Sequence, residues 1–476
     1  MMHGVVPYRD LFDQKGILLY FLYGIGYLFF RTTFAGVFIL EVIAGALSIG
    51  AILKILQLYV SAQSAYILTP LTAACMYSAR SFYWGGSAEE FLMPALVWGL
   101  YLLLRALTQE GPDALSPSVF FTGGILAGVV FHIKFSSIGF YIGWVAVVIL
   151  MVLTDKSDRR LARLCKGAGL FLAGVILVTL PFVLYFGIHG AIDDWFRVYI
   201  YDNLFIYSKT LSPGERIYGM CKTVYNQMMA NKRFAVWIVA GVVLPLFCAI
   251  RDRSRRTILT WGTIVVTLAL LTTVIFIGGV DLPYYPFPMS AFTVTGVVAC
   301  ARLAEGLFRS RRDEERGDAA GKLSKTLPLM ALGILLATGL CYRGSMNAPE
   351  IGMKQEELCL FRLRDHIRAR GVEDPKIINM GGFDAGLYTL LDSVPECYYF
   401  QTQTIPLPGI WETQKDYVQS GGPDFVLSCF GYFDFAMPGY RYVGEVSQFL
   451  AGQEFHFWLY EREEYADIGG EGVIVD

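Results

Sequence analysis

Runs of hydrophobic residues fill most of the first 343 positions, with short polar segments between them. Ten of these runs approach the roughly 20 residues that a helix needs to cross a bilayer. They occupy residues 33–56, 59–78, 88–107, 118–134, 136–153, 167–188, 233–250, 257–280, 285–304 and 325–342. A further run, Ile17 to Phe30, is shorter, and its length favours a re-entrant or interfacial (juxtamembrane) helix over a span.

The pattern changes from about Ser345 onward. Residues 351–370 favour a helix, and short apolar runs between Gly, Pro and Asp predict strands. The predicted strands are 376–380, 397–400, 424–428, 442–446 and 456–460. We therefore predict an α-helical polytopic membrane protein, with a transmembrane domain over residues 1–343 and a small C-terminal α/β domain over residues 344–476.

Composition supports this division. The chain has 476 residues, of which 55% are hydrophobic and 17% charged, and a mean hydropathy of +0.48, so it is more apolar than a soluble domain. Its 39 basic and 41 acidic residues give a net charge of −2, and this balance predicts no nucleic-acid partner. Nine cysteines show no metal-binding spacing, so no cofactor is predicted and a divalent metal is not indicated.

Basic residues in the loops predict the orientation, because Lys and Arg mark the cytoplasmic side. They gather in residues 156–166, 251–256 and 309–325, three loops that are two predicted spans apart. The α/β domain, the loop at 79–88 and the first 15 residues then lie outside the cell membrane. The long loop 189–232 carries five basic residues and weighs mildly against this orientation.

Four charged residues stand directly before the Ile17–Phe30 run: Arg9, Asp10, Asp13 and Lys15. Charges at a bilayer boundary must be solvated, paired or bound to a ligand. Spacing alone favours a solvated juxtamembrane loop in which Lys15 reaches the lipid headgroups.

The same stretch contains a dense set of residues: Gly4, Pro7, Tyr8, Asp10, Phe12, Asp13, Lys15, Gly16, Leu18 and Tyr20. In this order they resemble the first-loop motif of GT-C superfamily glycosyltransferases, in particular the bacterial family related to protein O-mannosyltransferases and the lipid A aminoarabinose transferase. The resemblance implies that this loop binds a polyprenyl-phosphate donor, with Lys15, Arg9 and Tyr8 at the lipid phosphate. It also makes Asp10 and Asp13 candidates for catalysis or for orienting the two cations.

Two adjacent carboxylates, Glu89 and Glu90, open the run 88–107. A helix N-terminus favours Glu through its dipole, and Ser87 is a suitable cap, so a structural role explains them as well. The resemblance places a catalytic acidic residue in this second external loop. Either glutamate fits that role.

Further candidates stand at the outer ends of other runs. His132 and Lys134 close the run 118–134, where a boundary cation is expected, whereas the resemblance implies a phosphate ligand. Tyr284 and Tyr285 precede a span, as interface anchors do, whereas the resemblance implies a pair that lines the cavity.

The loop 189–232 carries Trp195, Tyr199, Tyr201 and Asn203, which suit either sugar stacking or the aromatic belt at the membrane interface.

In the resembling family a first span and an external Asp precede the first-loop motif, whereas this sequence begins inside that loop. We expect either that the sequence is part of a longer chain or that the protein no longer catalyses.

The resemblance implies an enzyme that moves a sugar from a polyprenyl-phosphate donor to a glycan, lipid or protein acceptor on the extracytoplasmic face. Cations would stabilise the leaving phosphate and a carboxylate would take the acceptor proton. One alternative is a transporter or flippase of lipid-linked sugars, which predicts charges deep within spans and internal repeats. Glu41 and Lys54 are the main such charges, and no repeat is evident. A non-catalytic scaffold is the other alternative.

Overall fold

Long apolar helices form the larger of two units into which the chain divides, the helical unit of Glu41–Phe182 and Lys209–Ala348. The second unit, here the α/β unit, combines Met1–Leu40, Val183–Ser208 and Pro349–Asp476. The computed structural model describes residues 1–82, 85–109, 115–154, 159–208, 211–309, 319–382, 386–402, 405–429, 431, 433, 435–450, 453–466 and 468.

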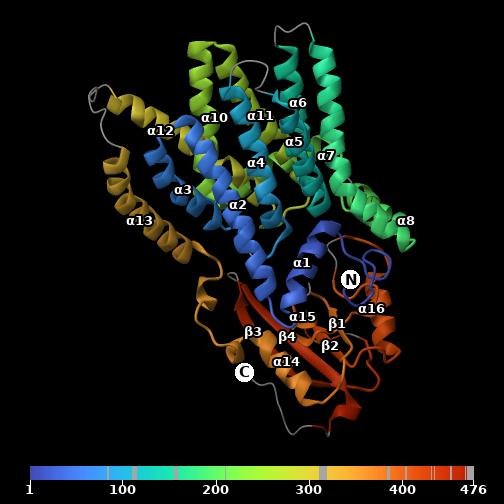
Figure 1. The fold of residues 1–476 in the computed structure, drawn as a ribbon. Coiled ribbons are helices and arrows are strands. Elements are labelled where there is room, and N and C mark those ends of the chain that lie inside the picture. Colours follow the sequence, from blue (N-terminus) through green and yellow to red (C-terminus); the bar gives the residue numbers. More distant parts are fainter. Residues whose placement is uncertain are drawn as a thin grey trace. The chain divides into compact units, whose positions relative to one another are not determined.

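The helices of the helical unit follow one another along the chain (Figure 1). They are α2 (Ala35–Tyr59), α3 (Ala62–Tyr77), α4 (Ala88–Thr108), α5 (Pro117–Ile133), α6 (Gly139–Leu153), α7 (Arg160–Ile188), α9 (Pro213–Ala230), α10 (Lys232–Asp252), α11 (Arg255–Phe276), α12 (Thr293–Arg309) and α13 (Ala319–Gly344). Short 3-10 helices, η2 (Phe135–Ile138) and η4 (Phe287–Phe292), lead into α6 and α12. The first residues of α2 and the last residues of α7 belong to the α/β unit.

Within the described residues, eight helical segments are long and apolar enough to cross a membrane. They are Ala35–Tyr59, Ala88–Thr108, Phe135–Leu153, Arg160–Ile188, Lys232–Asp252, Arg255–Phe276, Phe287–Glu305 and Leu327–Gly344. The other two predicted spans form α3 and α5, which have only 16 and 17 residues. The protein is thus a multi-pass membrane protein with eight to ten candidate spans, as the sequence predicts.

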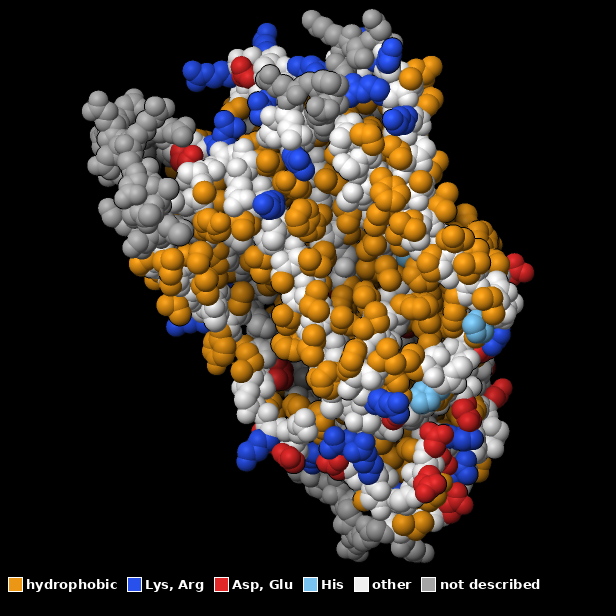
Figure 2. Space-filling model, viewed as in Figure 1, with side chains coloured by type: hydrophobic (Ala, Val, Ile, Leu, Met, Phe, Trp, Pro, Cys, Tyr) orange, Lys and Arg blue, Asp and Glu red, His pale blue; other side chains and the backbone are white. Residues whose placement is uncertain are grey.

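The surface of the helical unit is apolar where a bilayer would contact it. Figure 2 shows hydrophobic side chains spread over the visible face of these helices. Phe247 on α10 is 64% exposed and Leu335 on α13 is 70% exposed. Patches of this kind are costly in water and suit lipid.

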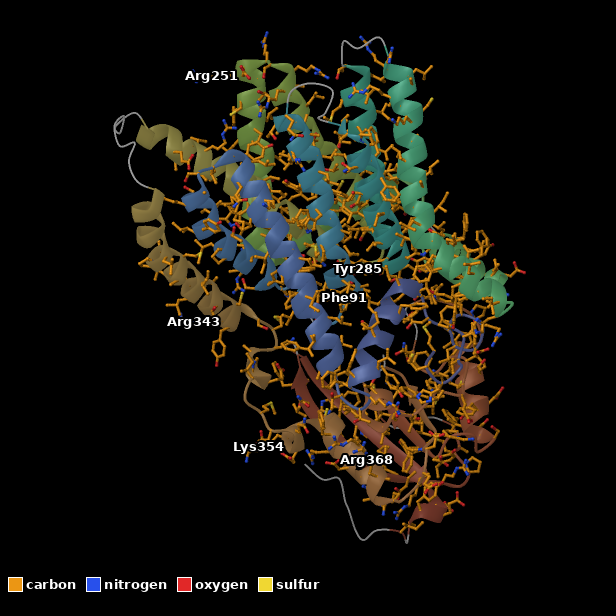
Figure 3. All side chains as sticks on the ribbon, viewed as in Figure 1. Phe91, Arg251, Tyr285, Arg343, Lys354 and Arg368 are labelled. Carbon is orange, nitrogen blue, oxygen red and sulfur yellow. The ribbon has the colours of Figure 1, made fainter. Side chains whose placement is uncertain are left out.

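The two ends of the helical unit differ. Arg251 lies at one end of the unit, whereas Phe91 and Tyr285 lie toward the other (Figure 3). The turn before α4 and the turn before η4 therefore open at the same end, opposite the basic loop after α10.

The α/β unit contains the N-terminal segment and the C-terminal sheet. Its elements are α1 (Ile17–Phe29), α8 (Ile192–Trp195), the π-helix η3 (Phe196–Ile206), η6 (Gln355–Glu357), α14 (Cys359–Ala369), β1 (Ile377–Met380), α15 (Leu387–Leu391), α16 (Ile410–Gln419), β2 (Phe425–Ser428), β3 (Tyr440–Leu450), β4 (Gln453–Arg462) and η7 (Glu463–Tyr465). The chain reaches this unit from α13 through η5 (Ala348–Glu350).

The sheet has the order β1-β2-β4-β3, with β1 and β2 parallel and the other pairs antiparallel. Successive strand residues face opposite sides. Ile377 and Phe425 pack on one side with Leu363 of α14. Ile378 packs on the other side with Val418 of α16. Helices thus cover both faces, and the predicted small C-terminal α/β fold is confirmed.

One predicted strand, residues 397–400, is wrong. The segment is irregular, although Asn379 donates one backbone hydrogen bond to Phe400 O at 3.3 Å. Its peptide groups instead contact the N-terminal segment: Phe12 N donates to Tyr398 O at 2.9 Å. The backbone groups that a ladder would need are therefore engaged elsewhere.

Candidate functional site

Tyr8 is the centre of the first-loop segment, Gly4–Gly16, in the α/β unit. Its side chain is 1% exposed, and its ring packs beside Phe186 and Tyr199. The Tyr8 hydroxyl donates to the carbonyl of Lys15 at 2.6 Å. Burial, aided by Tyr199 and Asp13, raises the pKa of Tyr8 well above its ordinary value, so this hydroxyl remains a donor.

The backbone of Tyr8 has a φ of 71°, a left-handed conformation that costs energy for a tyrosine. Two hydrogen bonds support the loop around it. Tyr8 N donates to Leu11 O at 2.9 Å, and the hydroxyl of Tyr398, in the same α/β unit, donates to Tyr8 O at 3.1 Å. Tyr8 thus connects the start of the first-loop segment to the Lys15 carbonyl at its end.

Arg9 and Asp10 form an exposed ion pair. Arg9 Nε lies 2.7 Å from Asp10 Oδ1, and Arg9 Nη1 donates to His189 O at 2.8 Å. Asp10 also accepts from Val6 N at 2.7 Å. The Arg9 hydrogen bond, opposed by partial burial, holds the pKa of Asp10 below its ordinary value, so Asp10 is an anion that fixes the loop.

Asp13 and Lys15 lie at the end of the same segment. Lys15 N donates to Asp13 Oδ1 at 3.2 Å. The Lys15 backbone is therefore held at both ends, through its N–H by Asp13 and through its carbonyl by Tyr8. These bonds fix the backbone from which the Lys15 side chain extends.

The π-helix η3 lies against the first-loop segment. Asn203 is 7% exposed and exchanges two hydrogen bonds with Gln14, each 3.2 Å long. The next residue back, Asp202, is 4% exposed. Burial, opposed by Arg197, raises the pKa of Asp202 above its ordinary value. The sequence analysis named Asn203 as a sugar-stacking or interface residue and did not name Asp202. The order of hydrophobic and polar residues predicts neither the π-helix nor its contact with the first-loop segment.

The helical unit brings together a second group of candidates. Gly85 and Gly86 both have positive φ, which glycine adopts without strain. Ser87 follows as the N-cap residue of α4. Glu89 in the first turn is 1% exposed and forms an ion pair with Lys134. Lys134 is the residue at which α5 ends and η2 begins.

Two tyrosines complete this group. Lys134 Nζ lies 4.0 Å from the centroid of the Tyr285 ring and 5.3 Å from that of Tyr284. Such contacts between a cation and ring faces strengthen when desolvated. We name Glu89, Lys134, Tyr284 and Tyr285 the α4–α5 cluster. Among the described residues, none makes a hydrogen bond with Glu89 Oε2, which leaves that oxygen able to accept a proton.

Glu90 faces away from this ion pair. Its Oε1 accepts from the Ser87 hydroxyl at 3.1 Å, and its carboxyl group interacts with that of Glu41 on α2. Glu41 also accepts a hydrogen bond from Gly86 N. Glu41 was noted in the sequence only as an intramembrane charge, and the structure instead ties it to the turn that precedes the two glutamates.

His132 does not join the α4–α5 cluster. Its side chain is fully buried, its Nε2 lies 2.8 Å from the Thr179 hydroxyl, and its ring packs on Phe182. This placement between α5 and α7 favours a packing role over phosphate binding.

The candidates thus form two groups, one in each unit. Tyr8, Arg9, Asp10, Asp13 and Lys15 belong to the first-loop segment. Glu89, Lys134, Tyr284 and Tyr285 form the α4–α5 cluster, with Glu90 beside it. Among the described residues, no group of three or more His, Cys, Asp or Glu side chains is arranged to hold a metal ion.

No protein-family model and no curated protein matches the sequence. Among solved structures, the chain is similar to ArnT from Cupriavidus metallidurans in the apo state, with a TM-score of 0.55, 13% identity, and coverage of 94% of this chain and 88% of ArnT. ArnT bound to undecaprenyl phosphate gives a TM-score of 0.52 with the same identity and coverage. The chain has the fold of GT-C membrane glycosyltransferases.

This finding confirms the fold expected from the first-loop motif. The GT-C likeness extends over the helices and the C-terminal α/β domain together, because it covers 94% of the chain. A weaker likeness, with a TM-score of 0.45 and 12% identity over 87% of this chain and 61% of the other, is to the archaeal oligosaccharyltransferase AglB from Archaeoglobus fulgidus.

Proposed function

We propose that this protein transfers a sugar from a polyprenyl-phosphate donor to an acceptor on the extracytoplasmic side of the membrane. The observation that carries the proposal is the likeness in fold to ArnT over 94% of the chain. ArnT has been solved with undecaprenyl phosphate bound. The first-loop motif supports the same donor class, since it offers a lysine whose backbone is fixed on both sides.

In this proposal Lys15 binds the lipid phosphate. Transfer displaces the phosphate from the anomeric carbon, and the oxygen that leaves gains negative charge. A compact ammonium held in advance near that oxygen stabilises the charge as it develops. Tyr8 and Asp13 fix the Lys15 backbone through its carbonyl and its N–H. Arg9 supports the loop through Asp10 and His189 rather than acting as a second phosphate ligand.

Glu89 is the carboxylate that we assign to the acceptor. The acceptor hydroxyl must lose a proton as it attacks, and the buried Glu89 Oε2, for which no hydrogen-bond partner is found among the described residues, offers a place for that proton. Lys134 holds the other oxygen of Glu89 and fixes its direction. Tyr284 and Tyr285 then line the space around the pair, and Glu90 supports the turn together with Glu41.

The positive-inside rule supports the orientation. The end of the helical unit that carries Arg251 would face the cytoplasm, and the end that carries Phe91 and Tyr285 would face outward (Figure 3). Residues 1–343 would act as the membrane domain, and the α/β domain 344–476 would lie outside, where the acceptor is a glycan, lipid or protein of the cell envelope.

Sugar transfer by the full-length protein in liposomes tests the proposal. A panel of radiolabelled polyprenyl-phosphate sugars is supplied with an envelope extract as acceptor, and release of the free polyprenyl phosphate is followed. We expect release by the wild type and a loss of about 100-fold in Lys15→Ala. Lys166→Ala is the control, because Lys166 is an exposed lysine of α7 near the basic loops. Movement of intact donor across the bilayer without cleavage would favour a flippase instead.

A further inference from the structure

Asn203 and Gln14, which are 189 residues apart in the chain, are joined by two hydrogen bonds in the α/β unit. Gln14 Nε2 donates to Asn203 Oδ1, and Asn203 Nδ2 donates to the main-chain carbonyl of Gln14, each at 3.2 Å. Gln14 is the residue directly before Lys15. A primary amide suits this exchange because it carries both donors and an acceptor.

The rest of the Asn203 amide is held by its own helix. Its Nδ2 also lies 3.1 Å from Tyr199 O and 3.4 Å from Val198 O. The amide is therefore fixed in one orientation, and its position depends on the backbone of η3. A side chain held in this way transmits the position of the helix to its partner.

The same helix contacts the first-loop segment at a second place. Four residues before Asn203, the Tyr199 ring stacks on the Tyr8 ring with centroids 6.2 Å apart. One face of η3 thus contacts both Tyr8 and Gln14. Tyr8 donates the hydrogen bond that fixes the Lys15 carbonyl, and Gln14 directly precedes Lys15 in the chain. Both contacts bear on the lysine from outside the motif.

The helix that makes this double contact has π geometry. In η3 the backbone bonds run from i to i+5, as in Tyr207 N to Asp202 O at 2.8 Å. Such helices are rare and occur frequently at functional sites. Tyr199 and Asn203 are four residues apart on this helix, so any change in its backbone geometry would move both contacts with the first-loop segment.

We propose that η3 is the element that positions Lys15 for the lipid phosphate, with Asn203 as its positioning residue. This inference rests on the proposed function. It adds a residue outside the first-loop motif that determines how tightly the donor binds. Asn203 acts through Gln14 and does not itself touch the donor.

Binding of undecaprenyl phosphate to the purified full-length protein in detergent tests this inference. We expect Asn203→Ala to raise the Kd about tenfold, since it removes both hydrogen bonds to Gln14. Gln14→Ala should have a smaller effect, because the bond from Asn203 to the Gln14 carbonyl survives. In the double variant the Kd should equal that of Asn203→Ala alone, as expected for two residues acting through one contact.

Leu204→Ala is the matched control, since Leu204 is the next residue of η3 and is 46% exposed. Its Kd should match that of the wild type. Melting temperatures are measured beside every Kd, because a purely structural role for Asn203 lowers stability without changing the affinity of the folded protein. Where Asn203→Ala does not fold, Asn203→Asp replaces it, since it keeps the acceptor for Gln14 and loses the donors.

An unchanged Kd in a folded Asn203 variant would overturn the inference and leave the proposed function standing. If the wild type itself binds no undecaprenyl phosphate, both the proposed function and the inference fail. The two failures are therefore distinguishable in one experiment.

Discussion

Glu89 in the first turn of α4 and Lys134 at the end of α5 form a buried ion pair, with the two side chains 2% and 14% exposed. Breaking such a pair by removing one partner leaves a buried charge uncompensated. We expect Lys134→Met to lower the free energy of unfolding by about 3 kcal/mol or more. Thermal unfolding in detergent measures the loss.

The double variant Glu89→Gln/Lys134→Met is the control for that experiment. It removes both charges together, so it should be clearly more stable than Lys134→Met alone. Equal stability of the two variants would mean that the ion pair is not formed.

Tyr8→Phe tests the hydrogen bond that holds the Lys15 carbonyl. The variant keeps the ring contacts with Phe186 and Tyr199 and removes only the hydroxyl. A lost hydrogen bond of this kind costs about 1 kcal/mol, so the Kd for undecaprenyl phosphate should rise about fivefold. Tyr201→Phe is the control, since Tyr201 is 49% exposed. A wild-type Kd in Tyr8→Phe would remove Tyr8 from the account.

The raised pKa of Asp202 predicts that the stability of the folded protein depends on pH. Its pKa is raised above 3.8 in the folded protein, so the unfolded chain ionises first as the pH rises. The wild type should therefore lose stability as the pH increases from about 4 through the raised pKa. Asp202→Asn should not show this loss and should melt at a higher temperature at pH 7. Parallel pH profiles for the two proteins would contradict the prediction.

The lowered pKa of Glu461 on β4 predicts the opposite pH dependence, a loss of stability as the pH falls. The carboxylate is 0% exposed and binds Arg370 at 2.8 Å, Arg441 at 2.5 Å and His366 at 3.1 Å. Burial alone would raise the pKa of Glu461, but these three side chains hold it below its ordinary value near 4.5. Its stabilising effect is present above that value and is lost as the pH falls through the lowered pKa.

We expect Glu461→Ala to destabilise the α/β domain by about 3 kcal/mol or more, because Arg370 is left buried without a counter-charge. Glu464→Ala should change little, since that side chain is 61% exposed in its pair with Arg462. Equal melting temperatures for the two variants would show that the buried network contributes nothing.

Much of the fold follows from local patterns. Long apolar runs specify membrane helices because lipid leaves the backbone no other partners. Short apolar runs bounded by Gly, Pro or Asp lead to β2 and β4. The predicted strand at 397–400 is wrong, and the Tyr398 carbonyl within it accepts a hydrogen bond from Phe12 N, which is nearly 400 residues away. Contacts at that separation leave no local trace in the sequence.

The candidate residues show the same division. The resemblance to the GT-C family leads to Glu89, Lys134, Tyr284 and Tyr285, whose types and places alone suit structural roles, and the fold gathers them into one cluster. The contact between Asn203 and Gln14 joins residues 189 apart in the chain, and the buried network of Glu461 depends on strand pairing. Neither set of contacts can be predicted before the fold of the α/β unit is known.

The most direct test of the central claim compares two lipids that differ only in the phosphate. Purified full-length protein is titrated with undecaprenyl phosphate and with undecaprenol, and Lys15→Ala is titrated beside it with Lys166→Ala as the control. The account predicts that the wild type and the control bind the phosphorylated lipid at least about tenfold more tightly, as one charge-assisted contact allows, and that Lys15→Ala loses this preference. Equal affinity of the wild type for both lipids would contradict it.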